Sequence, residues 1–143
     1  MKQSHILIGA CAVAIVAAVY VLQSRSTTET ATLASGTGGP IVEVMLPAIE
    51  GNAAIGKSIF DRACASCHGA NAVGIDGTAP PLVHKIYEPS HHSDEAFQRA
   101  VAGGVTSHHW PFGNMPPVER LTRGDVKMIV AYIRELQRAN GIR

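Results

Sequence analysis

The stretch RACASCHGAN, residues 62–71, holds two cysteines and a histidine within five consecutive positions. A redox-active dithiol needs the Cys-x-x-Cys spacing at the start of a helix inside a strand-helix-strand pattern, and the sequence shows no such alternation. A structural zinc site needs four ligands, but the remaining cysteine, Cys11, lies in an apolar run near the N-terminus. Because His68 directly follows Cys67, the two could hardly bind one ion together without strain. Neither kind of site explains the stretch.

The spacing Cys-x-x-Cys-His is the signature of c-type haem attachment. In such a site two thiols add to the two vinyl groups of haem, and the histidine beside the second cysteine binds the iron. The sequence therefore predicts one covalently bound haem c, attached to Cys64 and Cys67, with His68 as an axial ligand of the iron.

The size and charge of the chain limit what else it can be. It has 143 residues, a formal net charge of +1 and 5% aromatic residues. Once the N-terminal apolar run and a polar linker are set aside, about ninety residues remain, enough for one small domain whose core a prosthetic group would supplement. The nearly balanced charge argues against nucleic-acid binding.

The N-terminal third of the sequence indicates where the protein is located, and not how its domain folds. Residues 6–22 form an uncharged apolar run, so we expect a single-pass signal anchor over residues 1–23. A cleaved signal peptide, and a lipoprotein acylated at Cys11, are the alternatives. Residues 24–50 predict a flexible linker rich in Ser, Thr and Gly. Within it, the apolar strip 41–46 could pack on the domain or contact a partner.

The location of the domain follows from its chemistry. Bacterial thioether attachment of haem takes place on the outer side of the cytoplasmic membrane. We therefore expect residues 51–143 to form a haem-binding domain in the periplasm, held at the inner membrane by the anchor.

Three helices are predicted in residues 51–143, which makes the domain all-α. Asn52 can cap the first helix, which ends at Cys64. Ser93 can cap the second, with its stop near Gly103. Thr122 and Asp125 resemble a capping box that opens the last helix, in which four residues face inward with Tyr132 beside them: Val126, Ile129, Val130 and Ile133.

The loop between the last two helices contains tandem prolines and a glycine, so it cannot be helical. Met115 in this loop carries a soft thioether suited to haem iron, and His plus Met ligation raises the reduction potential. We expect Met115 to be the second axial ligand. Trp110 either covers the haem edge, donates its indole N–H to a propionate, or packs as an ordinary core residue.

At this point residues 51–137 resemble the class I c-type cytochromes. The resemblance is carried by Cys64 to His68 and by further residues in the helices and loops: Gly56, Phe60, Ala79, Pro80, Pro81, Leu82, Asn114, Met115, Pro116, Ile129 and Tyr132. It implies a cytochrome c fold of three main helices around one haem. In that fold the Pro80 carbonyl accepts a hydrogen bond from His68, Leu82 packs against the porphyrin, and Gly56 and Phe60 meet Ile129 and Tyr132.

The resemblance has one departure, at Ala79. The family commonly has Gly-Pro where this chain has Ala79-Pro80. Alanine tolerates this turn only if its φ is negative.

Five further histidines exceed what a haem domain needs: His84, His91, His92, His108 and His109. They are polar loop residues, ligands of a second metal such as copper or zinc, or, for His108 and His109, substitutes for Met115 at the iron. The sequence leaves these interpretations open.

The function expected from these features is one-electron transfer between membrane redox complexes of a respiratory or photosynthetic chain. Two axial ligands from the protein would leave no open iron site for a substrate, so we expect an electron carrier and not an enzyme. The alternatives are a haem subunit of a larger oxidase or dehydrogenase, and a haem domain with a second, copper site built from the histidine pairs.

Overall fold

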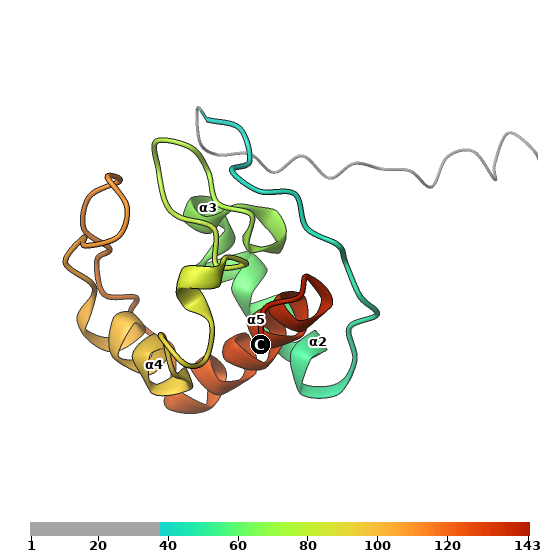
Figure 1. The fold of residues 1–143 in the computed structure, drawn as a ribbon. Coiled ribbons are helices and arrows are strands. Elements are labelled where there is room, and N and C mark those ends of the chain that lie inside the picture. The colour runs from blue at the N-terminus through green and yellow to red at the C-terminus, as the bar shows by residue number, and fades with distance from the viewer. Residues whose placement is uncertain (1–37) are drawn as a thin grey trace, which may run out of the picture. The chain divides into compact units, whose positions relative to one another are not determined.

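The computed structural model describes residues 38–143, and this part of the chain is helical (Figure 1). Its elements are the α-helices α2 (Gly51–Ala63), α3 (Ala65–His68), α4 (Asp94–Gly103) and α5 (Arg123–Ala139), and the 3-10 helices η1 (Ala70–Ala72) and η2 (Lys85–Tyr87). Within these described residues there is no strand beyond two isolated bridges, Ile75 with Ala79 and Val105 with Met115. The architecture fits the all-α class predicted from the sequence.

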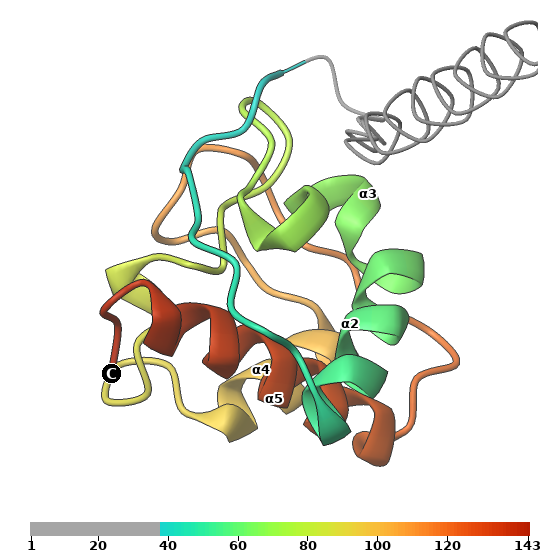
Figure 2. The ribbon, with the colours of Figure 1, turned by 90° about the vertical axis from the view of Figure 1, so that its right-hand side faces the viewer.

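The core of the domain is the packing of α2 against α5 (Figure 2). Gly56 permits it, because a Cβ atom at this position would lie 1.8 Å from the Met128 carbonyl oxygen. One turn later, the rings of Phe60 and Tyr132 meet edge to face with centroids 5.6 Å apart and an interplanar angle of 61°, a favourable arrangement of aromatic quadrupoles. The contact between the first and last helices that the resemblance implied is confirmed.

The N-cap residues of the helices can be compared with those predicted from the sequence. Thr122 and Asp125 form the predicted capping box: Asp125 N–H donates to Thr122 Oγ1 over 3.1 Å, and Thr122 N–H donates to Asp125 Oδ2 over 2.9 Å. Ser93 occupies the N-cap of α4, although its side chain makes no capping hydrogen bond to the described chain. The prediction that Asn52 caps the first helix is wrong. Extended backbone continues through Glu50, which takes the N-cap position, so Asn52 falls inside the first turn.

The inner face of α5 is confirmed as predicted and also holds two polar residues. Val126, Ile129, Val130 and Ile133 are buried, with Tyr132 beside them. Arg134 and Gln137 are buried too. The Arg134 guanidinium donates to the Tyr87 carbonyl over 2.7 Å, and Gln137 Nε2 donates to the Leu82 carbonyl over 2.9 Å. These bonds fasten the chain around η2 to α5.

After a bend at residues 41 and 42, residues 43–50 run along the helical domain without regular secondary structure (Figure 2). The backbone N–H groups of Ile41 and Val42 both donate to the Val73 carbonyl over 3.2 Å. Farther on, Asn140 binds the Met45 backbone twice, accepting from its N–H over 2.8 Å and donating to its carbonyl over 2.9 Å. Of the two possibilities left open for the strip 41–46, packing on the domain is the one observed.

The predicted anchor over residues 1–23 and most of the linker lie outside the described residues. Among residues 38–143, no helix has the length and apolar character needed to cross a bilayer. The membrane anchor therefore remains a prediction from the sequence.

Candidate functional site

A cavity of about 870 Å³ lies between α2, α4, α5 and the loops that connect them. Its volume is within the range of about 300 to 1,000 Å³ that is usual for ligand and cofactor sites. All seven site residues expected from the sequence line it: Cys64, Cys67, His68, Pro80, Leu82, Trp110 and Met115. Residues from three separate segments of the chain thus line one cavity.

Cys64 and Cys67 stand where α2 gives way to α3. Cys64 caps the C-terminus of α2, and the backbone N–H groups of Cys67 and His68 donate to its carbonyl over 3.1 and 2.9 Å. Neither cysteine is in a disulfide with another described residue. Burial, followed by the neighbouring Cys67, raises the pKa of the Cys64 thiol to about 11. Reactive thiols have lowered pKa values, so a raised pKa does not favour the Cys64 thiol as a nucleophile in disulfide exchange.

His68 is buried and held in one orientation. Its Nδ1 lies 2.8 Å from the Pro80 carbonyl oxygen, which can only accept, so Nδ1 carries the proton and the lone pair is on Nε2. Burial lowers the pKa of His68, and the hydrogen bond to Pro80 partly offsets that effect. A neutral imidazole with an oriented ring is the form that binds metals. The hydrogen bond implied by the resemblance is present.

The Pro80 carbonyl is placed by a short closed loop. Gly74 N–H donates to the His68 carbonyl over 2.7 Å, and Ile75 N–H donates to the Ala79 carbonyl over 3.0 Å. Ala79 is absent from the described residues with positive φ, which is the condition its alanine required. The departure from Gly-Pro therefore leaves the turn intact.

Met115 is fixed at the end of a loop closed on itself. Val105 and Met115 exchange two backbone hydrogen bonds of 2.9 and 3.0 Å, and Ser107 N–H donates to Asn114 Oδ1 over 2.9 Å. The preceding Gly104 must be glycine here, since its φ is +74° and a Cβ would lie 2.6 Å from the Met115 carbonyl oxygen. The thioether is half-buried on the cavity wall.

Trp110 brings a polar atom to the same cavity. Its ring lies 5.2 Å from that of His84 and stacks at 11° on that of Phe112. The indole Nε1 is buried and makes no hydrogen bond to any described residue; Tyr87 lies nearby, but not in bonding geometry. A buried N–H of this kind costs about 1 to 3 kcal/mol unless it finds an acceptor. An acceptor belonging to a bound group would meet that need.

Comparison with known families decides the class. Residues 53–137 match the sequence model of the family described as Cytochrome c. The chain belongs to the cytochrome c family. No similar protein was found among curated sequences.

The site of this cytochrome fits the cofactor of its family, a covalently bound haem c. It offers two uncommitted thiols at the attachment spacing, a buried histidine with a free Nε2, a methionine from a different segment, and a buried donor without an acceptor among the described residues. Family membership also supports electron transfer through haem as the function of the cytochrome.

The apolar side of α4 also belongs to this site. Phe97, Ala100 and Val101 are half-buried and line the cavity. Within residues 38–143, α4 is the one α-helix that buries no side chain. The apolar face of α4 therefore faces the cavity.

Sequence reasoning missed two residues that shape the site, Arg134 and Gln137. They hold the Tyr87 carbonyl, and Tyr87 lines the cavity. A signal was present, because two polar residues three apart continue the inner, otherwise apolar face of α5. Side chains in such positions are normally hydrogen-bonded to backbone they must support.

Four of the surplus histidines reach the rim of the cytochrome's cavity: His91, His92, His108 and His109. Desolvation and the neighbouring histidines lower the pKa of His92 and of His109. His84 stands apart from this group; its Nδ1 accepts from Ile86 N–H over 3.2 Å and so caps η2.

Proposed function

We propose that this cytochrome is a one-electron carrier anchored in the inner membrane, with its domain in the periplasm. Cys64 and Cys67 are proposed as the covalent attachment points of haem c, and His68 and Met115 as the axial ligands of its iron. Bound haem would supply a ferric-ferrous couple that gains or loses one electron without proton transfer to substrate.

The observation that carries this proposal is the meeting of His68 and Met115 on one cavity. His68 comes from α3, and Met115 comes from the loop after α4, forty-seven positions later in the chain. Two protein ligands would fill both axial positions. An iron without an open position transfers electrons and does not activate oxygen or peroxide.

The surrounding residues would prepare such an iron for transfer. Pro80 fixes the His68 ring through a hydrogen bond of 2.8 Å, which resists rotation and strengthens Nε2 as a donor. Phe60, Leu82, Ile129 and Ile133 give the cavity an apolar wall, which excludes water and limits reorganisation when charge changes. A thioether ligand favours the reduced iron and raises the potential.

Access for a partner is provided at the attachment end. Cys67 is exposed although it lines the cavity, so this end of the site reaches the surface. The partners we propose are redox complexes of a respiratory or photosynthetic chain, which a tethered domain would reach from the anchor over residues 1–23. Nucleic acid is not among them, because the chain carries a formal net charge of +1.

The test is a substitution at Met115 in the haem-loaded protein. Met115→Ala should abolish the weak far-red sulfur-to-iron absorption band of the ferric state and lower the reduction potential in a spectroscopic redox titration. Met45→Ala is the matched control, since Met45 is 68% exposed and does not line the cavity. An unchanged band and potential in Met115→Ala would reject Met115 as the ligand.

A further inference from the structure

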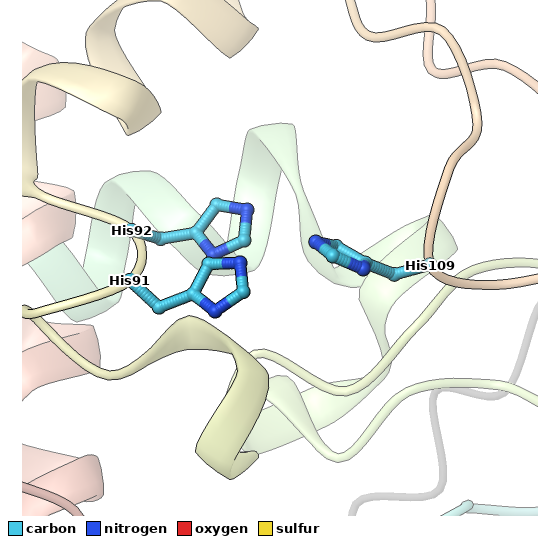
Figure 3. A group of neighbouring side chains, drawn as sticks. All are labelled: His91, His92 and His109. Carbon is cyan, nitrogen blue, oxygen red and sulfur yellow. The ribbon is translucent and has the colours of Figure 1, made fainter.

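Two loops bring histidines together at the rim of the cavity (Figure 3). His91 and His92 precede α4, while His109 lies in the loop that follows it and points back toward them. One ligand nitrogen from each of the three residues can be chosen so that all lie within 4.8 Å of one another. Helical periodicity cannot explain this grouping, because His91 and His92 precede α4 and His109 follows it.

The geometry of the three rings leaves a shared space between them. The rings of His91 and His92 are nearly parallel, at 6°, with centroids 4.7 Å apart. The ring of His109 stands across both, with centroids 5.2 and 5.3 Å away. A tetrahedral ion with metal-nitrogen bonds of about 2.1 Å needs nitrogens about 3.4 Å apart. Rotation of the exposed side chains of His91 and His109 can supply the difference.

The backbone that carries the three histidines is held by hydrogen bonds in which their imidazole rings take no part. The N–H groups of His91 and His92 donate to the Glu88 carbonyl over 3.0 and 2.8 Å, and the buried Arg134 guanidinium donates to the His92 carbonyl. On the other side, the paired backbones of Val105 and Met115 close the loop that carries His109. Little ordering of backbone would accompany binding of an ion.

His92 is already set as a ligand. Its Nδ1 lies 2.6 Å from the Ile86 carbonyl oxygen, so Nδ1 carries the proton and Nε2 keeps its lone pair. A metal-binding histidine typically donates its second nitrogen to such a carbonyl, which fixes the tautomer and strengthens the ligand.

We propose that His91, His92 and His109 bind one divalent transition-metal ion, zinc or copper, in addition to the haem. Imidazole nitrogens suit both metals, and three protein ligands leave a position for water. The site shares no ligand with the proposed haem iron, so it goes beyond the electron-carrier function and does not depend on it.

The experiment uses the full chain with haem attached, purified in detergent and freed of metals. Zn²⁺ and, separately, Cu²⁺ are titrated in competition with a chromophoric chelator, and haem absorbance counts the protein. We expect one ion per haem. His91→Asn and His109→Asn should each weaken binding more than about 100-fold, beyond the 10- to 100-fold typical for loss of a partner outside the ligand set.

His108→Asn is the matched control. His108 is adjacent to His109 and equally exposed, but it is not one of the three grouped residues, and its Nδ1 lies 2.8 Å from the Thr106 carbonyl oxygen. This variant should bind as the parent does. Binding of neither ion at one per haem, or equal weakening in His108→Asn and His109→Asn, would overturn the proposal.

Haem spectra of the variants keep the two proposals apart. An unchanged ferric spectrum in His109→Asn, together with lost metal binding, places the ion in its own site. A changed iron coordination in that variant would mean that His109 serves the haem instead, and would reject the metal site. The metal titration does not depend on electron transfer, so it could still be carried out if the protein proved not to be a reversible electron carrier.

Discussion

The two halves of this domain are stabilised in different ways. Where α2 meets α5, side chains fill the space completely: Phe60 and Tyr132 have no exposed surface, and Ile133 and Leu136 are 1% exposed. Around α4 and the loop after it, apolar side chains such as Phe97 and Met115 are half-buried and line the cavity. The helix pair is complete through its own side chains, whereas the loop half depends on what the cavity binds.

The difference follows from how each half is encoded. The helix pair uses apolar residues at helical spacing, a glycine at the crossing and a capping box, all of which act locally. The loop half uses proline, positive-φ glycine at Gly104 and Gly113, and hydrogen bonds from residues distant in sequence, such as the bond from Arg134 to the Tyr87 carbonyl. A cofactor anchored at Cys64 and Cys67 would connect the halves.

Removing the attachment points should produce the largest effect. In Cys64→Ala/Cys67→Ala we expect no haem to remain with the protein after denaturing electrophoresis or extraction with acidified solvent. Hydrogen exchange should then rise far more in residues 105–115 than in α5, because α5 keeps its packing on α2. Haem that stays bound to the variant would contradict attachment at these cysteines. An equal rise of the hydrogen-exchange rate in both halves would contradict their different modes of stabilisation.

The packing of α2 on α5 can be destabilised by a substitution at the point where the two helices cross. Gly56→Ala should lower the free energy of unfolding by about 3 kcal/mol, because its Cβ would lie 1.8 Å from the Met128 carbonyl oxygen. Urea unfolding of the haem-loaded protein measures this. Gly103→Ala is the control: Gly103 is also helical, as the last residue of α4, but a Cβ there would meet nothing within 4 Å, so this substitution should change stability by less than about 1 kcal/mol.

Arg134 links the halves through a buried side chain. Arg134→Met should cost about 2 to 3 kcal/mol, since it leaves the His92 carbonyl without its donor and removes one of the two donors to the Tyr87 carbonyl. Arg138→Met, one turn later, should cost less than about 1 kcal/mol because its bridge to Glu135 is half exposed. Similar urea midpoints for the two variants would show that Arg134 does not support the loop.

The features that could be predicted from the sequence are the locally encoded ones. The haem motif, the capping box and the inner face of α5 are local patterns, and the structure holds each where the sequence placed it. The supports from Arg134 were not predicted, and a shared site of the histidine pairs was only one of several interpretations that the sequence left open. Each depends on where a loop lies relative to a distant helix, which no local spacing encodes.

The capping box offers the smallest and most specific test of the local half. Thr122→Ala should cost about 1 kcal/mol near neutral pH, as loss of an N-cap side chain usually does. Hydrogen bonds from Thr122, chiefly from its side chain, lower the pKa of Asp125. A lowered pKa in the folded state adds stability above the ordinary carboxyl pKa, and this contribution is lost as the pH falls through the lowered value. The difference between parent and Thr122→Ala should therefore shrink below about pH 4. Urea titrations at both pH values measure it, and a difference that stayed constant would show that Asp125 takes no part in the cap.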